Sequence, residues 1–198
     1  MHGVLRYYTV DAKNVNEIVR RVAAEGLTFL KTIPGFLSWG LMDAGHGHMV
    51  TYSVYEAKTG TDESTKKAAA WIKENVASLN PSPPQVVEGA VRLRELKDSP
   101  KYGVIRRYQV DEKNVDQIVT RAKNGFLPLV TKLPGFASYS ILGAGKGTLL
   151  TTSGFTAFSG TAESTQAAAK FVKEHLASLV PKPPEVTSGE VKLFERAR

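Results

Sequence analysis

The feature that most limits how this chain can fold is that it repeats itself after one hundred residues. Residues 3–11 match residues 103–111 without a gap, and the same offset aligns the turns and proline-rich segments further on. Nearly half of the aligned residues are identical. Solenoid repeats are a few tens of residues long, whereas this unit has the size of a small domain. The sequence therefore predicts two similar domains, at residues 1–97 and 102–198.

The overall composition is typical of a soluble globular protein, with 42% hydrophobic and 23% charged residues. No apolar stretch is long enough to span a membrane, and the N-terminus lacks the basic and apolar regions of a signal peptide. Because the chain has no cysteine, disulfides, thiol nucleophiles and Cys-ligated metals are excluded. A cytoplasmic protein without a membrane partner is the natural expectation.

The net charge of +7 raises the question of nucleic-acid binding. Basic residues, however, occur singly or in pairs such as Arg20 with Arg21, mostly with acidic residues nearby. A phosphate-binding surface needs a run or stripe of positive charge, and the sequence contains none. The charge pattern therefore predicts a basic surface and no nucleic-acid partner.

Within each repeat, the hydrophobic pattern predicts the order strand, helix, strand, strand, helix, strand. In the first repeat the strands are expected at residues 4–10, 36–44, 49–57 and 86–95. Asn14 and Glu17 suit a capping box at the start of the first helix, and Pro34 stops it. Gly60 and Thr61 are expected to punctuate the chain before the second helix. This order is the split βαβ, or ferredoxin-like, arrangement.

Both faces of the predicted sheet carry large apolar groups, although the helices can cover only one of them. On the strand at residues 36–44, for example, Trp39 and Leu41 point to one face and Phe36 and Met42 to the other. Covering the second face contributes roughly 10–20 kcal/mol at the usual value per unit area. We therefore expect an α+β fold in which two tandem ferredoxin-like units pack their antiparallel sheets into an intramolecular α+β barrel. This internal pseudo-dimer leaves further homo-oligomerisation open.

In its element order and motifs, the sequence resembles the antibiotic biosynthesis monooxygenase family of the dimeric α+β barrel superfamily, here as a tandem duplication. The resemblance rests on the element order, on the helix that ends in Pro-Gly-Phe at residues 34–36, and on the Ala-Ala-Ala-Trp segment at residues 68–71. It extends over essentially the whole chain, twice. In that superfamily two units pair sheet to sheet, usually as a homodimer.

The resemblance implies several activities. Some members oxygenate polyaromatic substrates without a metal or flavin, because the substrate's own enolate reduces O₂ in an apolar cleft. Other members degrade haem, are isomerases or have no established activity. The haem-degrading branch uses an Asn, Trp and His set. Trp71 could stand for the Trp, but Pro81 occupies the position of the His, and the first strand offers no Asn. Haem degradation is therefore disfavoured, and no cofactor is expected.

The first strand of each repeat carries an arginine and a tyrosine two residues apart, on one face: Arg6 and Tyr8, Arg106 and Tyr108. One interpretation is a catalytic ligand clamp, in which the guanidinium binds an acidic or enolate oxygen and the phenol donates a hydrogen bond or a proton. The alternative is structural, with each arginine paired to a carboxylate such as Glu95 or Glu195 and each tyrosine filling the core.

Further side chains could line a binding cavity. Trp39, Tyr139 and Tyr52 could stack on a flat aromatic ligand. Arg107, which replaces Tyr7 of the first repeat, would make a shared cavity asymmetric. The alternative for the aromatic residues is an ordinary role in the hydrophobic core.

The histidines offer weaker candidates. His46 and His48 flank one glycine at the predicted hairpin tip, but the second repeat has Lys146 and Thr148 there. Two histidines without a third ligand do not make a zinc site, so no metal is expected. His175, on the second helix of the second repeat, could shuttle protons or serve only as a structural hydrogen-bonding group.

The sequence thus leads to two functional hypotheses. The first is a cofactor-independent monooxygenase that acts on a small aromatic or enolisable compound in a cavity between the two sheets. The second is a non-catalytic small-molecule-binding or stress-related barrel protein. No phosphate-binding loop, nucleophile elbow or close carboxylate pair is present, which leaves hydrolases and nucleotide-dependent enzymes without support. The sequence also offers no strong candidate for a catalytic base.

Overall fold

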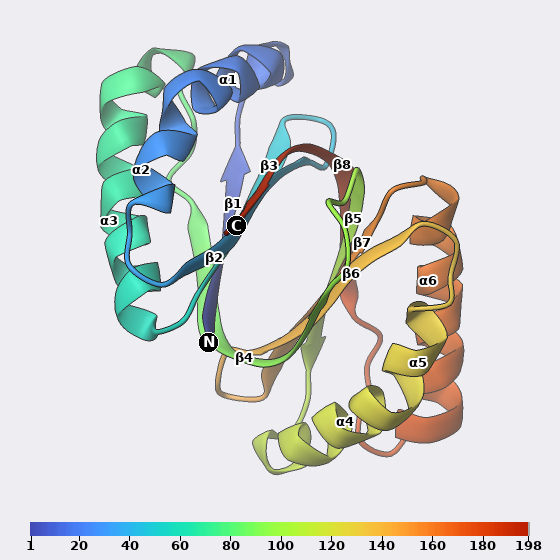
Figure 1. The fold of residues 1–198 in the computed structure, drawn as a ribbon. Coiled ribbons are helices and arrows are strands. Elements are labelled where there is room, and N and C mark those ends of the chain that lie inside the picture. The colour runs from blue at the N-terminus through green and yellow to red at the C-terminus, as the bar shows by residue number, and fades with distance from the viewer. Residues whose placement is uncertain (198) are drawn as a thin grey trace. The chain divides into compact units, whose positions relative to one another are not determined.

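A computed structural model describes residues 1–197, which form two compact units (Figure 1). Unit 1 contains Met1–Glu88 together with the chain from Val191 onward, and unit 2 contains Gly89–Glu190. Each unit combines helices with antiparallel strands, so the fold class is α+β. Among the described residues, no helix is both long and apolar enough to cross a membrane.

Unit 1 is built on three consecutive antiparallel strands in the spatial order β1-β3-β2. Its main elements are β1 (His2–Thr9), α1 (Val15–Arg21), α2 (Leu27–Lys31), β2 (Phe36–Asp43), β3 (His48–Tyr55) and α3 (Lys58–Asn75). A π-helical turn at Val22–Gly26 joins α1 to α2, and 3-10 turns lie at Ala12–Asn14 and Ala77–Leu79. The helices lie together over one face of this sheet (Figure 1).

Unit 2 repeats this arrangement with the strand order β5-β7-β6. Its elements are β5 (Tyr102–Gln109), α4 (Val115–Arg121), α5 (Leu127–Val130), β6 (Phe136–Gly143), β7 (Thr148–Phe155) and α6 (Ser159–Phe171). π-helical turns occur at Ala122–Phe126 and Val172–Leu176, and a 3-10 turn at Glu112–Asn114. The two long strands, β4 (Gln85–Leu96) and β8 (Glu185–Arg196), each contribute residues to both units.

The hydrophobic core of each unit lies between the sheet and its helices. In unit 1, Trp39, Leu41 and Met49 of the strands pack against Ile18 and Val22 of the helices. Alternate residues of a strand point to the same face, so Val4, Arg6, Tyr8 and Val10 form one row along β1. Arg6 therefore projects towards α3, and it is almost fully buried there.

The start of the first helix differs from the predicted capping box. The Asn14 side chain makes no capping bond and instead donates from Nδ2 to the carbonyl oxygen of Leu79, at 3.1 Å. Glu17 binds Arg20 and Arg21 rather than the backbone. The cap is displaced because Asp11 already starts a 3-10 turn by accepting a bond from the Lys13 N–H.

The second helix also starts earlier than predicted. Gly60 and Thr61 do not precede α3 but lie in its first turn, since the helix begins at Lys58. A Cβ atom on Gly60 would lie 2.8 Å from the Tyr55 ring, so the glycine lets the helix approach β3. As a result, the hydroxyl-bearing residues that follow Gly60 face the sheet.

Candidate functional site

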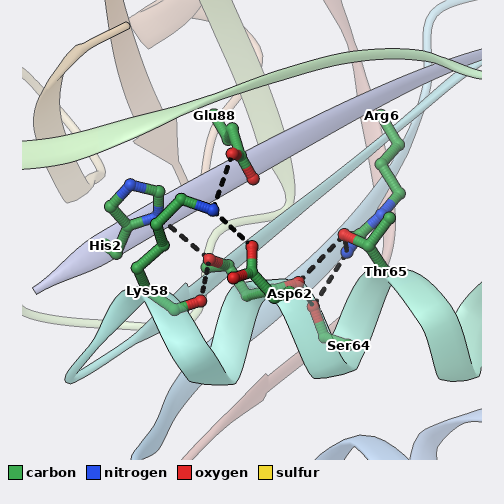
Figure 2. Close-up of polar contacts among 8 residues, drawn as sticks. His2, Arg6, Lys58, Asp62, Ser64, Thr65 and Glu88 are labelled. Carbon is green, nitrogen blue, oxygen red and sulfur yellow. Dashed lines mark hydrogen bonds and ion pairs between the residues drawn. The ribbon is translucent and has the colours of Figure 1, made fainter.

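The buried guanidinium of Arg6 is held by three hydroxyl groups from two elements, and Figure 2 shows the two on α3. Nη1 donates to Ser53 Oγ of β3 at 3.2 Å. Nη2 donates to Ser64 Oγ at 2.8 Å and to Thr65 Oγ1 at 2.7 Å, both on α3. The arginine thus joins the sheet to the helix at a point where apolar contacts would be expected.

The two α3 hydroxyls are oriented to accept these bonds. Ser64 Oγ and Thr65 Oγ1 each donate their own proton to the carbonyl oxygen of Thr61, at 2.8 and 2.9 Å. Their lone pairs are therefore available to the arginine. Thr61 in turn receives a contact from His2 Nδ1 at 2.9 Å, which extends the polar network to the start of β1 (Figure 2).

No carboxylate among residues 1–197 forms an ion pair with Arg6, and Glu195 pairs with Lys31 instead, at 2.8 Å. The Nε atom of Arg6 is also buried without a hydrogen-bond acceptor. Burial lowers the pKa of Arg6, as expected for a cation removed from water. Glu88 favours the charged form of Arg6 through a longer-range interaction. Hydroxyl groups, rather than the carboxylates of Glu95 or Glu195, therefore satisfy Arg6 among the described residues.

Beside Arg6 lies a cavity of about 70 Å³ between the sheet and helices of unit 1. Its lining is largely apolar and includes Arg6, Tyr8, Trp39, Trp71, Phe29 and Gly26. Tyr8 and Trp71 are partly exposed, so the cavity reaches the surface. Burial raises the pKa of Tyr8, which keeps its phenol protonated at neutral pH. The cavity therefore combines a buried cation and a phenolic donor with aromatic walls.

Unit 2 holds its arginine in the same way. Arg106 donates to Ser153 at 3.2 Å, to Ser164 at 3.0 Å and to Thr165 at 2.8 Å, and its Nε also lacks an acceptor. The neighbouring cavity, however, is only about 40 Å³. Among the described residues, its lining includes Tyr108 but not Arg106.

The structure separates the predicted site residues into two sets. Arg6, Tyr8 and Trp39 meet in the unit 1 cavity, and Tyr108 and Tyr139 meet in the smaller unit 2 cavity. Both cavities are lined by helices as well as strands, so the prediction that these residues face a space between the two sheets is wrong. Strand alternation explains the difference, because Arg6 and Tyr8 share the face that the helices cover.

Tyr52 and Arg107 do not join these sets. Tyr52 pairs with Leu5 across β1 and β3, and Arg107 pairs with Leu150 across β5 and β7. Each alternates along its strand with residues that face the helices, so each lies on the opposite face of its sheet. Neither residue lines the cavities described above.

Sequence reasoning missed the hydroxyl groups that bind the arginines. Their signal is the pattern Gly-Thr-x-Glu-Ser-Thr, which occurs at residues 60–65 and again at residues 160–165. In a helix, hydroxyls three and four residues after the Thr share its face. Polar residues on the buried face of a helix, identical in both repeats, indicate a shared buried polar partner.

No histidine is among the described lining residues of either cavity. The ring of His175 is 4.8 Å from that of Phe171, centre to centre, and its side chain is more than half exposed. His46 and His48 flank the hairpin tip, and within residues 1–197 no group of three or more potential ligands from His, Cys, Asp and Glu is placed to hold a metal. The described lining of neither cavity includes a histidine or a carboxylate. An acidic ligand must therefore bind already ionised or lose its proton to solvent.

No protein-family model and no curated protein sequence matches this chain. Similar solved structures do exist. A provisionally assigned monooxygenase from Fusobacterium nucleatum has a TM-score of 0.76 at 11% identity, over 98% of this chain and 94% of its own. A provisionally assigned monooxygenase from Lactobacillus acidophilus has a TM-score of 0.74 at 11% identity, over 99% and 97%.

A third similar structure is that of an anthrone oxidase-like protein. Its TM-score is 0.64 at 14% identity, and the match covers 99% of this chain and 93% of the other. At such low identity, the three likenesses establish a shared fold, and one fold supports many activities. The function must therefore be argued from the residues of the site.

Proposed function

We propose that unit 1 binds a small aromatic or enolisable compound as its anion and oxidises it with O₂, as an oxidase or monooxygenase that needs no cofactor. The observation that carries this proposal is the buried charge of Arg6, which has no ion pair among the described residues, beside an apolar, aromatic-walled cavity. The likeness to monooxygenase and anthrone oxidase-like structures supports the reaction class.

The charge of Arg6 favours an anionic ligand. A buried cation without an opposite charge is costly, and an anion in the cavity would offset that cost. Hydrogen bonds from a guanidinium to a negatively charged oxygen are about twice as strong as neutral ones. Arg6 favours the ionised form of a phenol or enol bound beside it, whereas burial favours the neutral form, as it does for Tyr8. Because the described lining provides no catalytic base, the ligand is expected to enter already ionised.

The proposed reaction converts a CH₂ group, activated by a neighbouring carbonyl or ring, into a carbonyl. Loss of one proton gives the enolate, whose carbon transfers an electron to O₂ and then forms a C–O bond to it. Protonation of the resulting peroxide returns that proton, and loss of water leaves the ketone. The balance is R₂CH₂ + O₂ → R₂C=O + H₂O. In this proposal Tyr8, which lines the cavity and whose phenol stays protonated, donates a proton to the peroxide.

The second candidate function is binding of a small anion without catalysis. It is favoured by the absence of an acid or histidine from the described cavity lining. In this case the cavity would take up the same ligands, and the bound anion would be protected from O₂.

Oxygen uptake separates the two functions. We expect the protein to consume O₂ with some members of a panel of one-ring phenols and cyclic 1,3-diketones, above the rate of spontaneous oxidation. Arg6→Met should lose at least about tenfold in rate, equivalent to one charge-assisted hydrogen bond. Arg20→Met, which removes an exposed arginine of α1, is the matched control. Binding by calorimetry without O₂ consumption would favour the second function, and neither binding nor consumption would exclude both.

A further inference from the structure

We propose that Gly26 keeps the unit 1 site open and sets the size of its ligand, and that Phe126 closes a latent copy of the same site in unit 2. This inference rests on the proposed function for the identity of the unit 1 site. It goes beyond that function by assigning a second ligand site and the residue that determines whether either site is open.

Gly26 is not required by the backbone. Its φ and ψ angles of −67° and −25° are helical, and any residue adopts them. A glycine inside a helical segment weakens the helix, so its presence calls for another reason. Gly26 is buried and lines the cavity, and a Cβ atom there would lie 3.4 Å from Cζ2 of Trp71. A methyl group would fit there, whereas a larger side chain would fill the cavity beside Trp71.

Phe126 occupies the equivalent position at the end of the unit 2 π-helical turn. It is buried, and its ring centre lies 5.4 Å from that of Tyr139 and 5.6 Å from that of Phe171. These two rings are the counterparts of Trp39 and Trp71 in the sequence repeat. Phe126 thus stands between the walls that remain apart in unit 1.

At most other lining positions that differ in size, the side chain in unit 2 is smaller, the reverse of the change from Gly26 to Phe126. Unit 2 has the smaller side chain in six pairs of counterparts: Trp39 and Tyr139, Trp71 and Phe171, Phe29 and Leu129, Val22 and Ala122, Leu30 and Val130, and Ile72 and Val172. Leu129 is also largely exposed, with 49% of its surface accessible. Apart from Phe126, only Leu176, in place of Val76, is a larger side chain than its unit 1 counterpart in the lining. The unit 2 cavity is nevertheless the smaller of the two. The ring of Phe126 therefore accounts for the closure.

The polar half of the unit 2 site is intact. Arg106 makes the same three hydroxyl contacts as Arg6, and its Nε is equally buried and without an acceptor. Unit 2 instead lacks open space beside the guanidinium group of Arg106. Removal of the Phe126 side chain should expose a second anion site without any change to the arginine or its hydroxyls.

The size of the unit 1 cavity restricts the ligand to one ring. Its volume of about 70 Å³ is about half the roughly 150 Å³ of an apolar cavity known to take benzene, so it encloses only part of one ring. The rest of the ring lies where the cavity reaches the surface, beside the partly exposed Tyr8 and Trp71. The ligand class is therefore a one-ring aromatic anion, such as a phenolate, with its oxygen towards Arg6.

Titration calorimetry with 4-nitrophenolate tests this assignment, and neutral 4-nitroanisole is the control ligand. We expect one bound phenolate per wild-type chain and weaker binding of 4-nitroanisole. Gly26→Phe should weaken phenolate binding by at least about tenfold, and Gly26→Ala by less. Phe126→Ala should add a second bound phenolate. Phe136→Ala, which removes another buried ring of unit 2 outside the cavity lining, should leave the stoichiometry at one.

Each result bears on the proposal. Wild-type affinity in Gly26→Phe overturns the role of Gly26, even if the protein is an active oxidase. If Phe126→Ala does not fold, Phe126→Val is titrated instead, and no second phenolate in a folded variant overturns the latent site. Arg106→Met in the same background should remove the second site, and its persistence would also overturn the proposal. A wild-type protein that binds no one-ring anion overturns the proposed function as well.

Discussion

Unit 1 and unit 2 hold their buried arginines with the same three hydroxyls but differ in what lies beside them. In unit 1 the neighbouring space is open and bordered by Gly26. In unit 2 the equivalent space is occupied by Phe126, which packs on two further aromatic rings. A duplicated chain can thus keep the polar framework in both copies and vary only the apolar packing beside it.

The surface at the start of α3 and α6 differs even more. In unit 1, Lys58 binds the carboxylates of Asp62 and Glu88 (Figure 2). In unit 2, Phe158 replaces the lysine and stacks edge to face on Tyr102, with ring centres 5.5 Å apart. Exposed ion pairs contribute little to stability, so either solution is tolerated at the surface. The buried arginine and its hydroxyls show no such variation.

The largest expected effect is on stability and comes from the packing at Phe126 and Gly26. Phe126→Ala should lower the free energy of unfolding by about 3–5 kcal/mol, because it removes a buried ring from a close-packed core. Gly26→Ala should raise the stability by up to about 1 kcal/mol, since the backbone is helical and the new methyl makes ordinary contacts. Denaturant unfolding of both variants measures the difference. Equal losses at the two positions would show that unit 1 is packed as tightly as unit 2.

The next effect is on phenolate binding, in which Arg6 and Arg106 should differ. Arg6→Met should weaken phenolate binding by about 1.5–3 kcal/mol, the usual contribution of a hydrogen bond to a charged group. The same change at Arg106 should leave that binding unaltered, because Phe126 blocks access to unit 2. Calorimetric titration of the two variants provides the comparison. Equal weakening of binding in both would contradict the difference between an open and a closed site.

A smaller effect should be shared by the two units. Thr65→Val and Thr165→Val each remove one acceptor of a buried arginine, at donor distances of 2.7 and 2.8 Å. Loss of a buried hydrogen-bond partner costs about 1–3 kcal/mol, so both variants should be destabilised by similar amounts. Unequal losses in denaturant unfolding would show that the two polar frameworks are not equivalent.

The smallest effect appears only at alkaline pH. Burial raises the pKa of Tyr55 from 10.0 to about 12, whereas unit 2 has Phe155 at this position. Between these pH values the unfolded chain loses the Tyr55 proton first, so stability should fall as pH rises from about 10 to 12. Tyr55→Phe should reduce this fall and leave stability at pH 7 nearly unchanged. Thermal unfolding across that range, with Phe155→Leu as a control, measures the change.

The periodic parts of the fold could be predicted from the sequence. The strand patterns and the turn at residues 45–47 carry local signals, and the predicted order of strands and helices in each repeat is the observed one. Helix starts could not be placed as well. Gly60 is a turn signal in sequence, but here it lets α3 pack against Tyr55, which only the tertiary contact reveals.

The candidate site was predictable in part. Strand alternation placed Arg6 and Tyr8 on one face and thus brought them together. It did not show whether helices cover that face, so the expected position of the cavity was wrong. Gly26 fits the apolar stripe of its helix as any small residue would, and its importance emerges only from the ring of Trp71 beside it. Residues that act by leaving space have no signature of their own in a single sequence.

The placement of the tryptophans has a practical consequence for spectroscopy. The chain has two tryptophans, and both line the unit 1 cavity. All indole fluorescence of the native protein therefore originates at one pocket, and changes in its intensity or colour report occupancy there without any label. Unit 2 has no tryptophan and therefore contributes no indole fluorescence. A Tyr139→Trp substitution in a chain without Trp39 and Trp71 would move the signal to unit 2, so that each copy could be observed separately.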